Sequence, residues 1–464
     1  MYVHSPPHRP ASGGTQTPVQ AVATGSLLAA LIFLLVFFYF WIGLDPLPDS
    51  TLIDPTKAYG GKSNRLNQIV VLLMAGIVLV TLLGKPSRTF LMRPWTLMML
   101  VFGWLFFADL FAGDPGTALR RTVFALIVCM CSSAALLIPK SRDQFVTLVT
   151  FGLIAMLGLA YLTVTVLPQV GIHQATDPLE AQLAGDWRAH FGHKNAAASA
   201  MAFSFFFGLY IAKARSFLVG CTIAVLSFVF LVKSGSKTST AIVPAILVVA
   251  WLYERWKGGR ILMVTGGLLT VNTILMSAAT SKPVQDFLES VGIDPTFTER
   301  TDIWQLALHA IGQSPLTGYG LQSFWQTDAL FRSTSAHYTW AVTAANSHNG
   351  YVELLINGGI PLFILGVIWL VFLPIGYSNR ALKSPNDPLL TRLFLRIWLY
   401  ALFLACLESA FFVNEGPIWF SILIGVFGLR LQANGTLVES TASPLRQQAV
   451  PAEFSRTAAS ANPR

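Results

Sequence analysis

The fold class follows from residues 25–44, which read GSLLAALIFLLVFFYFWIGL and contain no charged side chain. A helix that spans a membrane needs about 20 predominantly apolar residues, and this stretch provides them. Residues 1–24 are polar and rich in Pro and Gly, and no cleavage site of small residues accompanies the apolar stretch. We therefore predict an uncleaved transmembrane helix rather than a signal peptide.

Apolar stretches of this kind recur along the whole chain. Its 464 residues are 54% hydrophobic and only 11% charged, whereas soluble proteins carry roughly 25% charged residues, so the composition excludes a soluble enzyme. Stretches long enough to cross a bilayer lie at about 25–44, 67–84, 94–112, 119–138, 144–167, 195–213, 216–232, 238–254, 260–279, 350–376, 392–412 and 416–432. We predict an all-α polytopic membrane protein with about 12 transmembrane helices over residues 25–432.

Basic residues are unevenly distributed between the predicted connections. If the N-terminus is cytoplasmic, the inner connections contain Lys85, Arg88, Arg93, Lys140, Arg142, Lys213, Arg215, Arg255, Lys257, Arg260, Arg380, Lys383 and Arg392. The long outer segment 280–346 contains only Lys282, Arg300 and Arg332. The positive-inside rule therefore predicts that both termini are cytoplasmic. The formal net charge of +9 reflects this topology, and no nucleic-acid partner is predicted.

The predicted tails and loops differ in composition. Residues 1–24 and 433–464 are rich in Ser, Thr, Ala, Pro and Gln, which predicts disordered cytoplasmic tails. Two outer loops, about 168–194 and 280–349, are long enough to carry a functional site, and the larger one separates predicted helices 9 and 10. Apolar residues recur with a helical period over 303–311, which predicts an amphipathic helix at the outer membrane surface.

Several ionisable side chains fall inside the predicted transmembrane helices, and five of them share one side. An ionised group at the bilayer centre costs at least about 2.5–3.5 kcal/mol, so each position is informative. These residues are Asp109, Arg120, Arg121, Glu353 and Glu408, and the predicted orientation puts all five toward the outer face. We expect a polar cavity that opens outward. Snorkelling and pairing near helix ends is the alternative for any single one of them.

The outer loops add basic and imidazole side chains at the same level. They are Arg188, His190, His193, Lys194, Arg300 and His348, the last followed by Asn349. Guanidinium groups form bidentate hydrogen bonds to phosphate, and the helix start after Asn195 adds the positive end of its dipole. The cluster therefore predicts a site for a phosphate or pyrophosphate. A lipid-linked pyrophosphate is the natural anionic ligand at headgroup depth.

His348 is the candidate base of this site. If a pyrophosphate leaves from a sugar, the reaction needs a base that takes the proton of the acceptor hydroxyl. Histidine suits this role, because the ordinary pKa of its side chain, roughly 6.5, lies near neutral pH. The alternative is that His348 only caps the following helix together with Ser347 or Asn346. We interpret His173 as a loop residue without a role.

No metal site or other cofactor is predicted. His190 and His193 are three residues apart, but no carboxylate lies within the next helical turn and the chain contains no Asp-x-Asp. The four cysteines lie inside apolar stretches, which indicates neither disulfides nor a cysteine metal site. Residues 234–239, SGSKTS, lack the spacing of a Walker motif and are interpreted as a turn between helices.

These motifs, in this order, resemble those of a known family. The chain resembles the O-antigen ligase and polymerase (Wzy/WaaL-like) superfamily of bacterial membrane glycosyltransferases, and within it the ExoQ-type exopolysaccharide polymerases. The resemblance covers roughly residues 25–432. It rests on HFGHKN at 190–195, SGSKTST at 234–240, RTDIW at 300–304 with the segment 315–325, and HNGY at 348–351 with Gly358 and Gly359.

The resemblance implies a GT-C-like fold and a metal-independent, inverting transfer of a glycan from undecaprenyl pyrophosphate to an acceptor hydroxyl. The implied location is the periplasmic face of the bacterial cytoplasmic (inner) membrane. By the same resemblance, His348 is the base, Arg188 and Arg300 hold the pyrophosphate, and Lys194 assists them. The implied supporting residues are His190, His193, Asn349 and Glu353. Implied partners are a glycan or lipid acceptor, membrane lipids, and chain-length regulator and export proteins.

Three functions are open at this stage. A polymerase is preferred, because Gly359 is followed by Ile360, Pro361 and Leu362, whereas ligases often carry a small or polar residue there. A ligase would use the same chemistry to attach a finished glycan to a lipid A core. A transporter or lipid flippase would bind its substrate near the bilayer midplane between repeated halves, but no internal repeat is visible.

Overall fold

The computed structural model describes residues 18–47, 65–83, 93–177, 181–298, 300–327, 330–331, 341–384 and 387–434. Within these ranges the chain is helical and contains no β-strand, apart from an isolated antiparallel bridge between Ile172 and Trp187. The all-α prediction is confirmed for this part of the chain. The predicted disordered tails lie largely outside the described residues.

Every predicted transmembrane stretch contains a helix. In chain order the helices are α1 (Pro18–Trp41), α2 (Arg65–Leu83), α3 (Trp95–Asp109), α4 (Pro115–Leu137), α5 (Arg142–Val166), α6 (Pro168–Gly171), α7 (Lys194–Ala214), α8 (Phe217–Lys233), α9 (Lys237–Arg255), α10 (Gly267–Thr280), α11 (Lys282–Ser290), α12 (Arg300–Gln313), α14 (Gly350–Val367), α15 (Leu373–Ala381), α16 (Pro388–Leu404) and α17 (Pro417–Asn434). Short π-helical turns precede α10 and join α14 to α15.

Six described helical segments are long and apolar enough to cross a membrane. They are Arg65–Leu83, Pro115–Leu137, Arg142–Val166, Lys194–Ala214, Leu262–Thr280 and Gly350–Ala381. Shorter apolar helices occupy Ser26–Trp41, Trp95–Asp109 and Phe217–Lys233. The fold is therefore that of a polytopic membrane protein. The number of crossings, the inner or outer placement of the loops and the orientation of the termini stay predictions.

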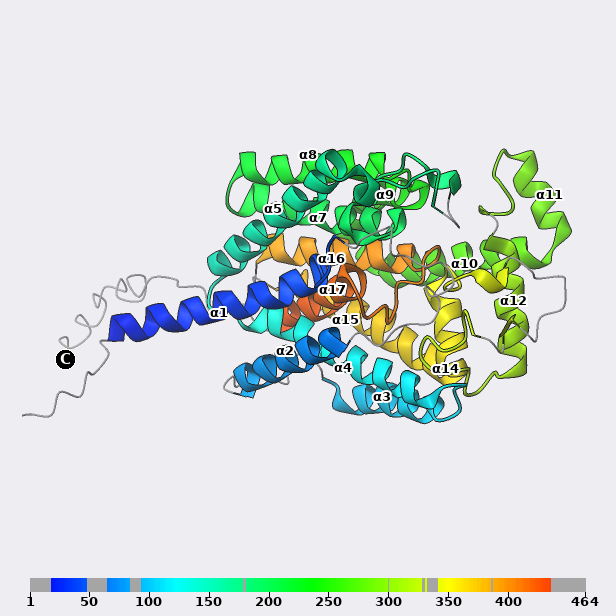
Figure 1. Cartoon of the computed structure of the whole chain (residues 1–464), viewed down its shortest axis with the longest axis horizontal. Helices are drawn as coiled ribbons and strands as arrows, with labels where there is room; N and C mark the ends of the chain where they lie inside the picture. Colours follow the sequence, from blue (N-terminus) through cyan, green and yellow to red (C-terminus); the bar gives the residue numbers. More distant parts are fainter. Residues whose placement is uncertain are drawn as a thin grey trace, which may run out of the picture.

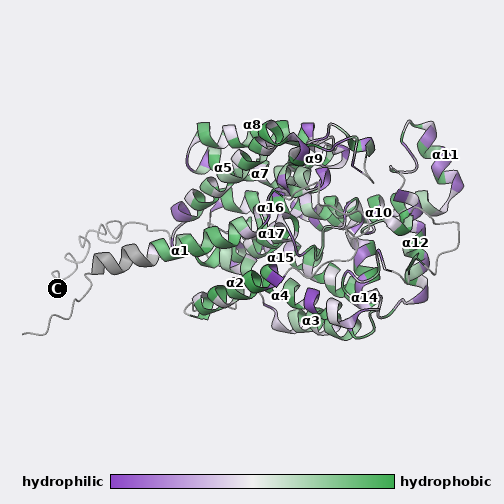
Figure 2. Ribbon diagram, in the orientation of Figure 1, coloured by the Kyte–Doolittle hydropathy of each residue, from purple (hydrophilic) through white to green (hydrophobic). Residues whose placement is uncertain are grey.

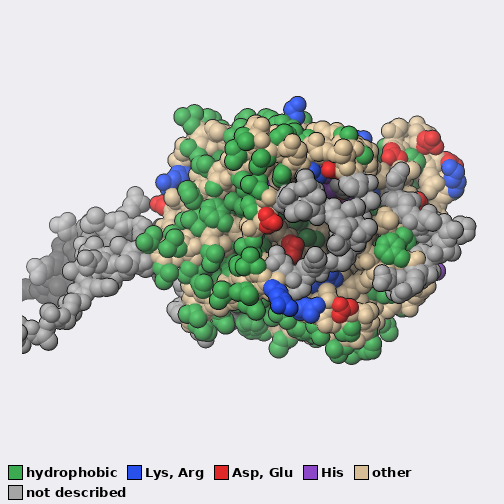
Figure 3. All heavy atoms as spheres, in the orientation of Figure 1, with side chains coloured by type: hydrophobic (Ala, Val, Ile, Leu, Met, Phe, Trp, Pro, Cys, Tyr) green, Lys and Arg blue, Asp and Glu red, His purple; other side chains and the backbone are tan. Residues whose placement is uncertain are grey.

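The surface of the long helices is suited to lipid. Figure 1 shows α1, α5, α8 and α16 running roughly along the long axis of the molecule, while α11 and α12 lie at the end remote from the start of α1. These long helices are mostly hydrophobic along their ribbons (Figure 2), and hydrophobic side chains cover a large part of the visible surface (Figure 3). Leu72 and Val80 of α2, for example, are 62% and 70% exposed. In water such a surface would favour aggregation, whereas in a bilayer it contacts lipid.

A break in α14 receives the loop that follows α12. Gly359 leaves the helical conformation with a φ of 67°. This break frees carbonyl groups, and the amide of Tyr319 donates to the carbonyl of Ile356 at 2.8 Å. A Cβ atom on Gly359 would overlap the carbonyl oxygen of Leu316, so glycine permits the close approach of loop and helix. The loop is thereby held next to the first half of α14.

Two predicted helices differ from the observed ones. The helix predicted over 392–412 is α16, which ends at Leu404, so the residues that follow it form a non-helical segment. The predicted amphipathic helix is present as α12, but its apolar side is turned to protein rather than to the membrane surface. Ile303 and Leu306 are buried in a cluster that includes Val352 of α14.

Candidate functional site

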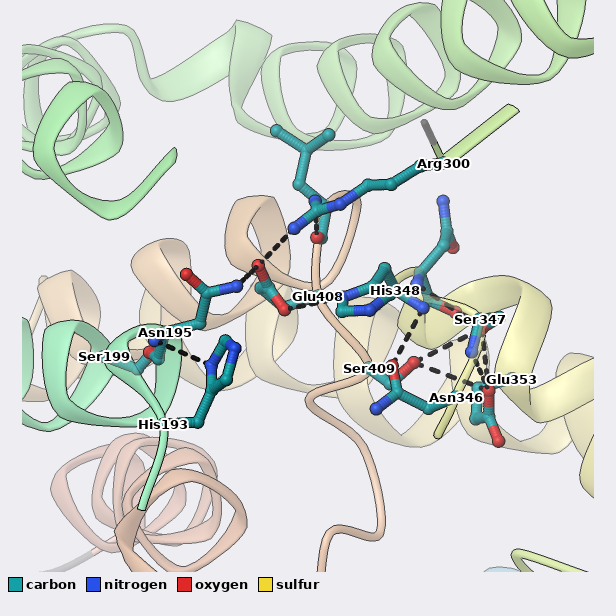
Figure 4. A network of polar contacts seen from close by, with 12 residues as sticks. His193, Asn195, Ser199, Arg300, Asn346, Ser347, His348, Glu353, Glu408 and Ser409 are labelled. Carbon is teal, nitrogen blue, oxygen red and sulfur yellow. Dashed lines mark hydrogen bonds and ion pairs between the residues drawn. The ribbon is translucent and has the colours of Figure 1, made fainter. Parts of the chain in front are cut away.

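Three helix starts and one helix end meet around the carboxylate of Glu408 (Figure 4). Glu408 lies in the segment after α16. Its Oε1 accepts hydrogen bonds from Nη2 of Arg300, at the start of α12, at 2.8 Å and from Nδ2 of Asn195, at the start of α7, at 3.0 Å. Its Oε2 lies 3.2 Å from Nδ1 of His348, just before α14. We call these four residues the carboxylate junction.

The carboxylate of Glu408 is ionised although it is enclosed. Its side chain is only 13% exposed. Burial alone would raise its pKa, but the charge of Arg300 and the contacts with His348 outweigh burial and lower the pKa to about 2. At neutral pH Glu408 is therefore a negatively charged acceptor that is shared by a guanidinium and an imidazole.

The backbone before α14 sets the place of His348. His348 has a φ of 49°, which is uncommon for a residue with a side chain, and its amide donates to Oδ1 of Asn346 at 2.9 Å. The helix cap is Asn349, whose Oδ1 accepts from the amides of Tyr351 and Val352 at 2.9 and 3.1 Å. The cap of α14 is thus Asn349 and not His348, and the imidazole of His348 faces Glu408.

Glu353 holds the other side of the same turn. It is 4% exposed, and its Oε2 accepts from the amide and the hydroxyl of Ser347 at 3.0 and 2.7 Å. Trp325 donates from Nε1 at 3.2 Å, and the hydroxyl of Ser409 lies at 3.4 Å. Glu353 thus links Ser347, the residue before His348, to Ser409, the residue after Glu408. These contacts fix the positions of His348 and Glu408 within the carboxylate junction.

Two imidazoles cap the start of α7. Nδ1 of His193 accepts from the amide of Asn195 at 3.1 Å, and Nε2 of His173 accepts from the amide of Lys194 at 3.2 Å. The two rings lie 5.5 Å apart. The N-terminus of α7, which the sequence predicts as an anion site, therefore has its first two amides hydrogen-bonded to these imidazoles. His173, interpreted from the sequence as a loop residue without a role, is 1% exposed and serves as a structural acceptor.

Arg188 and Lys194 form ion pairs within the loop that precedes α7. Nη1 of Arg188 lies 2.8 Å from Oδ2 of Asp177, and its Nε and Nη2 donate to main-chain carbonyls of α6 at 3.0 and 2.9 Å. Nζ of Lys194 lies 2.7 Å from Oδ2 of Asp186. Among the described residues, no side-chain hydrogen bond or ion pair joins Arg188 or Lys194 to the carboxylate junction, although Lys194 precedes Asn195 in the chain.

His190 lies apart from the carboxylate junction. It is 9% exposed, and its Nε2 is 3.0 Å from the carbonyl oxygen of Trp41 at the end of α1. Burial lowers the pKa of His190 to about 4, although the hydrogen bond to Trp41 opposes this change. Its imidazole is therefore neutral at neutral pH, and it ties the loop before α7 to α1.

Asp109 and Arg121 belong to a second polar cluster at the ends of α3 and α4. Asp109 accepts from the hydroxyl of Thr122 at 2.6 Å and from the amide of Leu321 at 2.8 Å. Arg121 donates to the main-chain carbonyl of Gln322. This cluster fastens the loop after α12. Asp109 and Arg121 thus lie in one cluster and Glu353 and Glu408 in another, whereas Arg120 donates to Thr117 at 2.6 Å within α4. Among the described residues, no hydrogen bond or ion pair joins all five.

Sequence reasoning missed Glu408 and Asn195 as members of the site. Glu408 was recognised as an ionisable residue toward the outer face, but its partners could not be named from sequence distance. Asn195 is recognisable only as a helix start and as the last residue of the HFGHKN motif. In the part of the chain that the structure describes, no group of three or more His, Cys, Asp and Glu residues is arranged to hold a metal ion.

Comparison with known proteins gives two similarities. Residues 200–367 match the family described as O-antigen ligase, and this region contains Arg300 and His348. The chain is also 31% identical over 103 residues to the exopolysaccharide production protein ExoQ of Rhizobium meliloti (strain 1021). That stretch is 22% of this chain and spans only 24% of the relative. The resemblance to the O-antigen ligase and polymerase superfamily, and within it to ExoQ, is thereby confirmed.

Proposed function

From this similarity, we propose that the chain is a membrane glycosyltransferase that polymerises oligosaccharide repeat units carried by undecaprenyl pyrophosphate. In the proposed reaction, a hydroxyl oxygen of one glycan attacks the anomeric carbon of another. The bond from that carbon to the pyrophosphate breaks, the configuration inverts, and a base takes the hydroxyl proton. The observation that carries the proposal is the carboxylate junction, because it holds an anion-binding guanidinium and a base on one carboxylate.

Arg300 is the group proposed to hold the leaving pyrophosphate. A guanidinium has five N–H donors. In Arg300, two of these donors bind Glu408 and the main-chain carbonyl of Leu407, and they fix the plane of the guanidinium. The remaining donors suit a pyrophosphate oxygen. As the bond to the sugar breaks, negative charge develops on the pyrophosphate, and a guanidinium already fixed in place stabilises it without reorganisation.

His348 is the proposed base, and Glu408 sets its tautomer. An ionised carboxylate can only accept a hydrogen bond, so Nδ1 of His348 carries the proton that faces Glu408. Nε2 then has the lone pair that can take the proton of the attacking hydroxyl. After this transfer the imidazolium is stabilised by the negative charge of Glu408. Glu408 is therefore a positioning residue for both reactive groups.

The remaining predicted site residues have supporting places in this proposal. Asn349 and Glu353 hold the turn that carries His348, and His193 caps the helix that carries Asn195. A direct role of Arg188 or Lys194 in pyrophosphate binding requires that each exchange its aspartate for the ligand.

The proposed setting is the periplasmic face of the bacterial inner membrane, with both termini in the cytoplasm. Proposed partners are membrane lipids, a chain-length regulator and export proteins. The second candidate function is that of a ligase, which the description of the matched family favours. A ligase would transfer one finished glycan to a lipid A core through the same groups, so the acceptor alone separates the two functions.

Reconstitution tests the proposal. The protein in liposomes receives a lipid-pyrophosphate-linked oligosaccharide, with or without a lipid A core acceptor. Polymerisation gives a ladder of longer glycans and free lipid pyrophosphate, whereas ligation gives a single product that needs the core. A preparation that retains its fold and yields neither product with either acceptor would refute a glycosyltransferase function.

A further inference from the structure

Arg396 of α16 is a partly buried arginine that lacks a hydrogen-bonded partner within the described residues. It lies in the middle of α16, about one turn beyond Arg392, and Arg392 is nearer the helix start, on the side away from the carboxylate junction. Its Nε atom is buried and has no hydrogen-bond partner, and none of the residues that the structure describes forms a hydrogen bond or ion pair with this side chain. An arginine at such a depth normally has an anion or a carbonyl group as its partner. Arg396 therefore has no anion bonded to it within the described residues, and the acidic group in electrostatic contact with it, Glu254, is already paired with Arg392.

The neighbouring charges leave this region positive. Glu254, near the end of α9, accepts from Nε of Arg392 at 2.9 Å and is the acidic group in electrostatic contact with Arg396. Arg260 donates to the main-chain carbonyls of Tyr253 and Glu254 at 2.7 and 3.2 Å, which are neutral acceptors. The carboxylate of Glu254 is thus shared by Arg392 and Arg396, whereas Arg260 is held by neutral acceptors. Asp387, which caps α16, does not add to this carboxylate, because it is paired with Arg142 at 2.7 Å.

The surface beside these arginines has the composition of a membrane interface. Trp251 and Trp256 are 52% and 53% exposed, and the guanidinium of Arg255 lies 4.5 Å from the ring centre of Trp251. Ile261 and Leu262, before α10, are 51% and 63% exposed. Exposed tryptophan at the level of basic side chains is typical of lipid headgroup depth, and exposed aliphatic side chains next to it contact acyl chains.

We propose that Arg396 and Arg392 bind the phosphate of an anionic phospholipid, in the leaflet at the end of the molecule opposite to the carboxylate junction. A guanidinium binds phosphate oxygens bidentately, and the long side chain of Arg396 reaches toward the headgroups while its stem stays among apolar groups. The acyl chains lie against Ile261 and Leu262. The positive-inside prediction makes this the cytoplasmic leaflet, where anionic lipids are concentrated. The inference does not depend on the proposed glycosyl transfer.

Lipid retention by the purified full-length protein tests this site. The protein in detergent is mixed with equal amounts of phosphatidylglycerol and phosphatidylcholine, and bound lipid is measured by native mass spectrometry. We expect the unsubstituted protein to retain phosphatidylglycerol preferentially and Arg396→Gln to retain about fivefold less of it. Arg215→Gln removes the same charge from an exposed position at the same end of the molecule, in the turn between α7 and α8, and should bind as the unsubstituted protein does.

Thermal unfolding distinguishes the lipid from free phosphate. Phosphatidylglycerol should raise the melting temperature of the unsubstituted protein more than that of Arg396→Gln, and inorganic phosphate at the same concentration should raise neither. Equal retention of the two lipids by the unsubstituted protein overturns the proposal, and this comparison needs no variant. Unchanged retention by Arg396→Gln, or an equal shift with inorganic phosphate, also overturns it.

Discussion

The substitution Glu408→Gln tests the carboxylate junction most directly. Glutamine keeps the size of the side chain and removes its charge, so Arg300 and His348 lose the carboxylate that they share. The surroundings lower the pKa of Glu408 to about 2 in spite of its burial. At about 1.4 kcal/mol for each tenfold change, this difference from the ordinary value corresponds to about 3 kcal/mol of stabilisation at neutral pH. The side chain is 13% exposed, so screening by solvent reduces this value little.

The stabilisation by Glu408 has a defined pH dependence. Because its pKa is lower in the folded protein than in the unfolded chain, the stabilisation is complete above roughly pH 4.5 and is lost as the pH falls toward about 2. We expect the free energy of unfolding of Glu408→Gln to be about 3 kcal/mol lower than that of the unsubstituted protein at pH 7. The difference should shrink as the pH falls below 4.5. Denaturant unfolding in detergent, followed by tryptophan fluorescence, measures both quantities.

A matched control separates this effect from a general loss of negative charge. Glu415 lies in the same segment after α16 but is exposed, so Glu415→Gln should unfold as the unsubstituted protein does. Equal stability of Glu408→Gln and the unsubstituted protein at pH 7 would refute the reasoning. A stability difference that stays constant from pH 7 to pH 3 would refute it as well, since the loss would then not arise from the carboxylate charge.

Three further substitutions test neighbouring features. His348→Ala should lower the rate of glycan transfer about 100- to 10 000-fold at normal membrane abundance, measured from the product ladder. An unchanged ladder would show that His348 is not the base. Arg188→Gln should lower the free energy of unfolding by about 1–3 kcal/mol, because Asp177 loses a charged donor; thermal unfolding that matches the unsubstituted protein would contradict this. Gly359→Ala should cost about 1–3 kcal/mol through its positive φ, whereas Gly376→Ala, in open space on α15, should not destabilise the fold; equal melting temperatures of the two variants would disprove the account of the α14 break.

The helices could be predicted because hydropathy acts locally. A stretch of apolar residues that is long enough to cross a membrane is helical in any neighbourhood, since its backbone groups must be satisfied within the segment. The end of α16 could not be predicted in this way, because Ala405, Cys406 and Leu407 are as apolar as the helix before them. The carbonyl of Ala405 accepts from the amide of Gly350 at 2.7 Å, and that of Cys406 accepts from Nδ2 of Asn349 at 2.9 Å. These tertiary contacts accompany the departure from the helix.

The candidate site could be predicted only in part for a related reason. Arg300 and His348 are recognisable, because basic and imidazole side chains at loop ends are rare in an apolar chain. Their common partner, Glu408, lies 60 residues beyond His348 in sequence, and only the packing of α16 brings it near. The sequence predicts that Arg188 binds pyrophosphate but does not show that the loop folds back and places Asp177 beside it, and the role of Arg188 stays a prediction.

The shared use of Glu408 also has a consequence for which anions Arg300 can bind. A small inorganic anion such as sulfate meets a guanidinium whose charge is already balanced by Glu408, so it can use only the remaining N–H donors of Arg300. A carrier with an attached sugar chain adds many further contacts outside the junction. Under the proposed function, Glu408 would therefore disfavour simple salts relative to the large lipid-linked donor.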